Sequence, residues 1–167
     1  MLIFHIIPKL GIDNHFSTGY NKFAREPRQR CRGNRCVIGA NLDPSHLIWQ
    51  GIDPVAATRA LAGAIYHVHA KDTKVDAYNT AINGVLDTKH YSDELHRAWV
   101  FRTVGYGNGE TYWRDFVSNL RLCGYDRVLS IEHEDSIMTI DEGLRKAVDF
   151  INKVIITEEK PRTMSWS

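Results

Sequence analysis

The feature that most constrains the fold is an alternation of short apolar segments with segments of helical character. The apolar segments are residues 37–42, 64–70 and 127–131. Helical segments follow them, and we place these at 54–63, at 111–123 and from Thr139 or Asp141 onward. A repeat of this kind is typical of a parallel sheet covered by helices. We therefore expect an α/β protein.

Side chains that bind metals or transfer protons stand where each predicted strand ends. The pairs are Asp43 and His46, then His67 and His69, then Glu132 and Glu134. The carboxyl ends of parallel strands emerge at one face of a sheet or barrel, so we expect these residues to be neighbours in space. His67 and His69 are two positions apart on a strand and therefore share a face, as do Glu132 and Glu134.

Imidazole nitrogens and carboxylate oxygens together form a ligand set suited to Mn²⁺, Zn²⁺, Fe²⁺ or Co²⁺. The alternative for each single residue is structural. A histidine at a strand end commonly packs or makes a hydrogen bond, and an aspartate before a proline, as at Asp43, commonly starts a turn. Because three successive strands all end in such residues, the pattern favours a metal site.

Charge is distributed unevenly along the chain. The 21 Lys and Arg residues and 20 Asp and Glu residues leave a net charge of +1, too small to draw the whole protein to nucleic acid. Residues 21–36 hold six basic residues and one acidic residue, a net +5, and predict an exposed basic segment. A nucleic-acid-binding arm is the alternative there, but a single aromatic residue supports it weakly. Residues 1–20 sum to zero, so residues 37–167 carry −4.

The sequence favours a cytoplasmic protein with no membrane or nucleic-acid partner. No stretch reaches the roughly 20 apolar residues that a membrane span needs. The apolar opening MLIFHIIP has no basic leader and no small-residue cleavage site, so we do not interpret it as a signal peptide. An odd number of cysteines, three, argues against a disulfide framework and fits a reducing compartment.

Four motifs, in order, carry a resemblance to a known family. They are NLDPSHLIWQGIDP at 41–54, HVHAKDT at 67–73, FRTVGYG at 101–107 and LSIEHED at 129–135. Together they resemble the sugar phosphate isomerase/epimerase family, and the resemblance covers residues 37–152. It implies the xylose isomerase-like TIM barrel as the fold.

The resemblance also implies a set of site residues around a divalent metal, which could be Mn, Mg, Zn or Co. The implied metal ligands are Asp43, His69 and Glu132. The implied substrate-binding residues are His46, Trp49 and Arg102. His67 is expected to support the metal site from beside it. The family supplies a further glutamate ligand from an earlier strand, and Glu26 is the sole glutamate that precedes Asp43 in this sequence.

The implied function is metal-dependent isomerisation or epimerisation of a sugar or sugar phosphate. A metal bound to the carbonyl and hydroxyl of a ketose stabilises an enediolate while a carboxylate, here Glu132, acts as the catalytic base. One alternative is a non-catalytic fragment of such an enzyme. Another is a zinc-dependent phosphodiesterase of the abasic-site endonuclease type. Such an enzyme requires a more basic surface than residues 37–167 provide.

Two further segments are open to more than one interpretation. Lys71 and Asp72 could bind sugar hydroxyls or a phosphate, or they could form surface salt bridges. The glycines at 105, 107 and 109 predict a mobile lid rather than a phosphate-binding loop.

The length of the sequence limits how much of a barrel it can form. A TIM barrel typically needs ~250 residues, and this sequence has 167. We therefore expect a partial TIM barrel, with the last three or so βα units at 37–157, an atypical basic N-terminal segment at 1–36 and a polar tail at 158–167. Such a partial barrel exposes strand edges, which favours a homo-oligomer that pairs through them.

Overall fold

The computed structural model describes residues 5–6, 14–15 and 39–158, and every structural statement below concerns these residues. The basic segment 21–36 and nearly all of the tail 158–167 lie outside them, so the domain boundaries drawn from the sequence stay predictions. Two short strands, β1 (His5–Ile6) and β2 (Asn14–His15), pair antiparallel.

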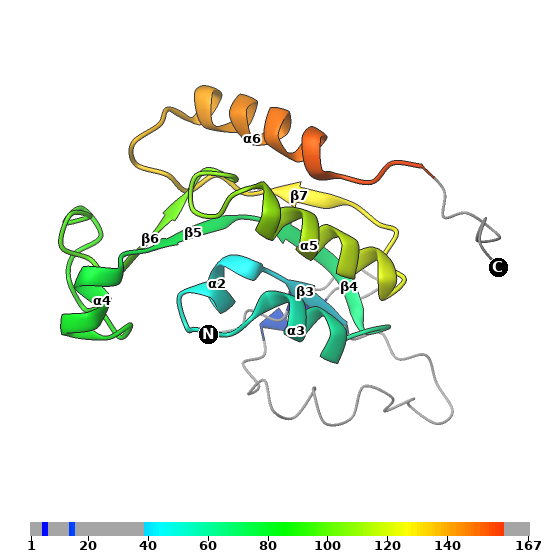
Figure 1. The fold of residues 1–167 in the computed structure, drawn as a ribbon, viewed down its shortest axis with the longest axis horizontal. Coiled ribbons are helices and arrows are strands. Elements are labelled where there is room, and N and C mark those ends of the chain that lie inside the picture. Colours follow the sequence, from blue (N-terminus) through cyan, green and yellow to red (C-terminus); the bar gives the residue numbers. More distant parts are fainter. Residues whose placement is uncertain (1–4, 7–13, 16–38, 159–167) are drawn as a thin grey trace.

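A parallel three-stranded sheet forms the centre of the fold (Figure 1). Its strands are β3 (Ala40–Leu42), β4 (Ile65–Ala70) and β7 (Leu129–Ile131), in the spatial order β3–β4–β7. These strands lie within the three apolar segments of the sequence, and their parallel pairing confirms the α/β prediction. The three strands have the same order across the sheet as along the chain, as in a TIM barrel, although β5 and β6 intervene between β4 and β7.

Four helices pack onto this sheet. They are α2 (Pro44–Ile48), α3 (Pro54–Ala60), α5 (Glu110–Leu122) and α6 (Ile140–Val154). Asp53 caps α3 and Thr139 caps α6, as their positions in the sequence predict. Helix α2 forms because the Asp43 carboxylate accepts a hydrogen bond from the Ser45 amide and Pro44 fits the first turn. No helix among the described residues is both long and apolar enough to cross a bilayer.

The segment between β4 and α5 departs from a simple βα repeat. Strand β5 (Asp72–Val75) and strand β6 (Trp99–Arg102) pair antiparallel, and helix α4 (Ala77–Asn83) lies beyond their end, in the segment of chain that connects them (Figure 1). Strand β6 pairs with β5 and lies outside the parallel sheet. The reason is local: a strand joins a parallel sheet through a crossover, whereas β6 returns directly alongside β5.

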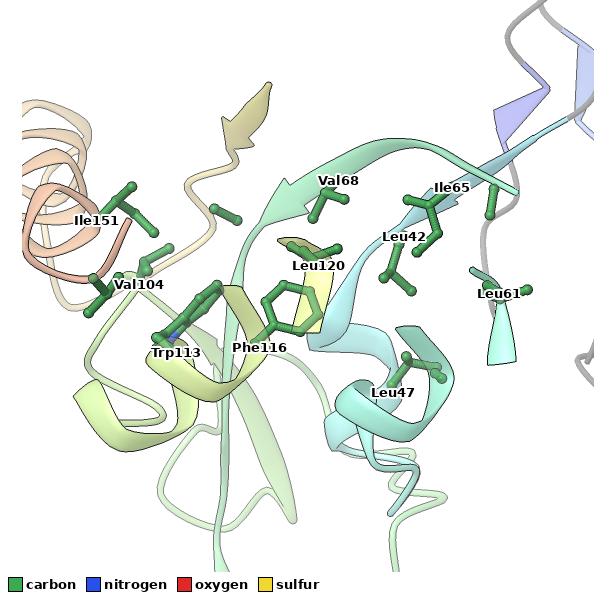
Figure 2. Packing of buried hydrophobic residues seen from close by; sticks show 14 of the residues in the cluster. Leu42, Leu47, Leu61, Ile65, Val68, Val104, Trp113, Phe116, Leu120 and Ile151 are labelled. Carbon is green, nitrogen blue, oxygen red and sulfur yellow. The ribbon is translucent and has the colours of Figure 1, made fainter. Parts of the chain in front are cut away.

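The position of the hydrophobic core shows which face of the parallel sheet can hold a functional site. Leu42 of β3 and Val68 of β4 are fully buried against helix residues, among them Trp113 and Phe116 of α5 (Figure 2). Successive side chains of a strand alternate between faces. Asp43, which follows Leu42, and His69, which follows Val68, therefore point away from this core. They point toward the face that would line the inside of a barrel.

Candidate metal centre

Strand register places the three predicted metal ligands side by side. The last pair between β3 and β4 is Leu42 with Val68. Asp43 and His69 each follow by one position, so their side chains are adjacent across the two strands. Across β4 and β7, His69 is paired with Ser130, and Glu132 follows Ser130 by two positions, on the same face. The face away from the core therefore collects all three residues.

Atomic positions agree with this register. One ligand atom from each of Asp43, His69 and Glu132 lies within 4.8 Å of the other two. The His69 Nδ1 atom is 2.6 Å from Glu132 Oε2. The side chain of Asp43 is 10% exposed, and its Oδ1 atom accepts hydrogen bonds from the amide and hydroxyl of Ser45. The structure brings together the metal ligands that the sequence analysis named.

The donor set fits a divalent cation. Nitrogen and oxygen ligands lie ~2.0–2.2 Å from a metal such as Zn²⁺, so two ligands of one ion are at most about 4.4 Å apart. The spacing limit of 4.8 Å in this triad exceeds that by a few tenths of an ångström, which side-chain rotation can close. Two carboxylates and an imidazole suit Mn²⁺, Zn²⁺, Fe²⁺ or Co²⁺. Three protein ligands also leave coordination positions for a substrate.

The orientation of the His69 ring follows from its two hydrogen-bonding partners. The Asn41 amide nitrogen lies 3.2 Å from Nε2, and the Glu132 carboxylate lies beside Nδ1. Which ring nitrogen carries the proton depends on the tautomer, and a metal ion binds the neutral ring through its unprotonated nitrogen. His67 lies next to His69 with the ring centroids 5.3 Å apart at 90°, which agrees with the supporting position expected for it.

Lys71 is a site residue whose position the sequence analysis left open. It is only 3% exposed, and its Nζ atom donates to Glu132 Oε1 at 2.9 Å and to Glu134 Oε2 at 2.5 Å. Its two alternatives were binding of sugar hydroxyls or a phosphate and a surface salt bridge; the residue forms salt bridges, but it is buried beside the candidate metal ligand Glu132. The alternation of HVHAK was the available signal, because His67, His69 and Lys71 share one strand face.

The charges of this cluster stabilise one another. Burial raises the pKa of Glu132, but the hydrogen bonds and charge of Lys71, with His69, outweigh it and hold the pKa below its usual value. Burial likewise lowers the pKa of Lys71, and the hydrogen bonds to Glu134 and Glu132 reverse this and raise it. At neutral pH Glu132 is therefore ionised and Lys71 is protonated.

Aromatic rings line one side of the centre. His46 makes an edge contact with Phe101, with centroids 5.4 Å apart, and Trp99 makes another with the same ring at 5.3 Å. Trp49 stacks on Trp99 at 4.7 Å. The Phe101 ring also lies under Lys71 Nζ, 4.1 Å from it, so this aromatic row leads from the metal centre to Trp49. Trp99 and Phe101 were missed in the sequence, although their alternation along β6 could have indicated a shared face.

Burial keeps His46 neutral. Its Nε2 atom lies 3.5 Å from Asp43 Oδ2, which favours the charged ring, but desolvation is the larger effect and lowers the pKa of His46 below 6.5. A neutral ring can donate and accept hydrogen bonds to a substrate. His46 thus lies beside the candidate ligand Asp43, and its substrate-binding role stays a prediction.

Arg102 is held on the far side of β6 from Phe101. Its guanidinium pairs with Glu94 at 2.7 Å and with Asp135 at 3.4 Å. Phe101 faces Lys71, and consecutive residues of a strand point to opposite faces. The structure therefore groups Arg102 with two carboxylates rather than with the metal ligands, and its substrate-binding role stays a prediction.

Asp72 organises the glycine-rich loop. Its carboxylate is fully buried and accepts hydrogen bonds from the backbone amides of Gly105, Gly107 and Asn108 at 2.9–3.1 Å. A Cβ at position 107 would lie 2.6 Å from the Thr73 carbonyl, so only glycine allows this approach. Asp72 is thus neither a sugar ligand nor a surface ion pair. This internal carboxylate holds the loop through its backbone amides, and the mobile lid expected at 105–109 stays a prediction.

Comparison with known proteins decides the family. A family model described as the xylose isomerase-like TIM barrel matches residues 9–154. The chain belongs to this family. The match begins inside the segment 1–36 that the sequence analysis set apart, so the family likeness extends beyond the four motifs. Members of the family include sugar isomerases and epimerases as well as abasic-site endonucleases, and they are commonly enzymes that bind divalent metals.

Two individual proteins illustrate the likeness. The chain is 42% identical over 119 residues to the "Uncharacterized protein YfiH" of Bacillus subtilis (strain 168), a match that covers 71% of the chain and 38% of YfiH. It also resembles the crystal structure of a xylose isomerase domain protein from Planctomyces limnophilus, with a TM-score of 0.52 and 23% identity over 72% of the chain and 39% of that protein. The chain therefore spans about two fifths of the length of these proteins, and a partial TIM barrel is the fold.

Proposed function

We propose that this chain carries the metal-binding part of an enzyme that isomerises or epimerises a sugar or sugar phosphate. The observation that carries the proposal is the convergence of Asp43, His69 and Glu132 at the carboxyl ends of three parallel strands. Ligands of this barrel type bind at that end of the strands. The family supports the reaction class, since it includes sugar isomerases and epimerases.

Asp43, His69 and Glu132 would hold a divalent cation, with Mn, Mg, Zn or Co as candidates. When bound, such an ion polarises the carbonyl and hydroxyl oxygens of a ketose and so favours an enediolate. Glu132 is ionised at neutral pH because its pKa is lowered, and a carboxylate oxygen can take the proton from the neighbouring carbon.

The aromatic row supports a sugar as the substrate. Small-molecule sites combine aromatic walls with a few polar groups that fix orientation. Trp49, Trp99 and Phe101 provide apolar faces, and the neutral ring of His46 provides a hydrogen-bonding group next to them. We propose a substrate position between this row and the metal ligands.

A phosphodiesterase on the same barrel is the less favoured proposal. A nucleic-acid substrate requires a positively charged surface that neutralises phosphates. Residues 37–167, which contain the whole proposed site, carry a net charge of −4. The charge balance therefore favours a small-molecule substrate over DNA.

Deuterium incorporation tests the proposed reaction. The chain is incubated in D₂O with Mn²⁺ and a panel of ketoses and ketose phosphates, and carbon-bound deuterium is followed by NMR. We expect incorporation next to the carbonyl of at least one sugar, because removing and returning a proton through an enediolate exchanges it with solvent. The His69→Gln variant serves as the matched control and should show no incorporation. Absence of deuterium in every sugar contradicts the proposal.

A further inference from the structure

The ammonium group of Lys71 is fixed by several contacts at once. Nζ donates to one oxygen of Glu132 and one oxygen of Glu134, and it lies 4.1 Å from the centre of the Phe101 ring. The residue is 3% exposed, so almost no water competes for these contacts. Lys71 therefore occupies a defined position beside the proposed metal ligands.

The two oxygens of Glu132 have different neighbours. Oε1 accepts a hydrogen bond from Lys71 at 2.9 Å, whereas Oε2 faces His69 Nδ1 at 2.6 Å. Lys71 thus holds one oxygen and leaves the other on the side of His69 and Asp43. A carboxylate held in this way presents a single oxygen to a cation placed among the three ligands.

We propose that Lys71 is a positioning residue that keeps Glu132 as a one-oxygen metal ligand, and that Glu134 offsets the charge of Lys71 so that the centre still attracts a cation. The inference rests on the proposed function, because it takes Asp43, His69 and Glu132 as the ligands. It assigns Glu134 a role that needs no contact with the metal.

Charge explains why Glu134 matters. An uncompensated ammonium group beside Glu132 repels a divalent cation, and in a partly buried site this repulsion is weakly screened. The Glu134 carboxylate accepts the second hydrogen bond of Lys71 and cancels its charge locally. The Glu134 side chain is itself 48% exposed, so replacing it should leave the fold intact.

Calorimetric titration of the full chain with Mn²⁺ at pH 7 tests the role of Glu134. For Glu134→Gln we expect a Kd about 10-fold or more above that of the unsubstituted chain, within the range of ~10- to 100-fold typical of groups that orient metal ligands. The thermal unfolding temperature measured in EDTA should not change. Glu110→Gln is the matched control, because it removes a carboxylate from an exposed ion pair with Arg114, and it should bind Mn²⁺ as the unsubstituted chain does.

A second variant tests positioning separately from charge. Lys71→Met combined with Glu134→Gln removes one positive and one negative charge, so the net charge of the centre is unchanged. Glu132 loses the hydrogen bond that Lys71 donates to its Oε1 atom. We expect this double variant to bind Mn²⁺ at least about 10-fold more weakly than the unsubstituted chain. If the double variant does not fold, Glu134→Gln alone decides.

The outcomes separate this inference from the proposed function. Unchanged Mn²⁺ affinity in Glu134→Gln overturns the role of Glu134, and unchanged affinity in the double variant overturns the positioning role of Lys71. An unsubstituted chain that takes up no Mn²⁺ overturns the metal centre itself, and the inference with it. Weaker binding in both variants, at an unchanged unfolding temperature, supports the inference.

Discussion

The Nδ1 atom of His69 lies 2.6 Å from Oε2 of Glu132, although 63 positions separate the two residues in the sequence. The contact exists because β4 and β7 are adjacent parallel strands whose register pairs His69 with Ser130. Glu132 then reaches the same face two positions later. An imidazole and a carboxylate held this close, with Asp43 beside them, form the centre on which the proposed function depends.

The ion pair between Lys71 and Glu132 predicts a pH window of stability. The pKa of Glu132 is lowered below 4.5, so its contribution is present above that pH and is lost as the pH falls through the lower value of the folded state. The pKa of Lys71 is raised above 10.5, so its contribution is present below that pH and is lost as the pH rises through the higher value.

Urea unfolding of the unsubstituted chain and of Lys71→Met, between pH 3 and pH 9, measures this contribution. The difference in free energy of unfolding should be constant between about pH 5 and pH 9 and should shrink toward pH 3. Glu142→Gln, which breaks an exposed ion pair with Lys146, should change the free energy of unfolding far less. A difference for Lys71→Met that is as large at pH 3 as at pH 7 would exclude the ion pair as its source.

Asp72→Asn should destabilise the protein without touching the metal ligands. The substitution keeps the size of the side chain but replaces one carboxylate oxygen with an NH₂ group. Because N–H donors face both oxygens of Asp72, some of them then lack an acceptor whichever way the side chain turns. Losing charge-assisted hydrogen bonds in a buried site costs about 2–4 kcal/mol. Chemical denaturation measures the loss, and the exposed substitution Asp93→Asn is the control. A loss below about 0.5 kcal/mol, the level of an ordinary surface change, would contradict the anchoring role.

Trp49→Ala tests the aromatic row as a substrate wall. Trp49 stacks on Trp99 and makes no contact with the proposed base, so the change should raise KM for the sugar and leave kcat nearly unchanged. We expect an increase in KM of about 10-fold, the effect of losing roughly 1.4 kcal/mol of binding free energy. Steady-state kinetics on whichever sugar shows deuterium exchange provides the measurement. A fall in kcat at constant KM would place Trp49 in another role.

Local patterns predicted the parts of the fold that depend on neighbouring residues. The apolar runs gave β3, β4 and β7, and the capping residues Asp53 and Thr139 gave the starts of α3 and α6. Strand-end positions predicted that the candidate site residues would be neighbours, because parallel strands bring their carboxyl ends together whatever the length of chain between them. The choice of Asp43, His69 and Glu132 as metal ligands came from the family resemblance and stays a prediction.

Contacts between distant segments account for what the sequence did not reveal. Lys71 and Asp72 are adjacent charged residues, yet one is buried by two glutamates more than 60 positions away and the other by a loop more than 30 positions away. Charged residues are almost never buried unless they are paired. Their partners become visible only when strand register and loop path are known, as does the pairing of β6 with β5 rather than with the parallel sheet.

Mn²⁺ titration of the unsubstituted chain and of His69→Gln at pH 7 tests the central claim most directly. The unsubstituted chain should bind Mn²⁺ at a single class of site. His69→Gln replaces the imidazole with an amide and should weaken binding by more than the ~100-fold upper range for groups that only orient ligands. Absence of binding by the unsubstituted chain, or equal binding by both proteins, would contradict a metal centre formed by Asp43, His69 and Glu132.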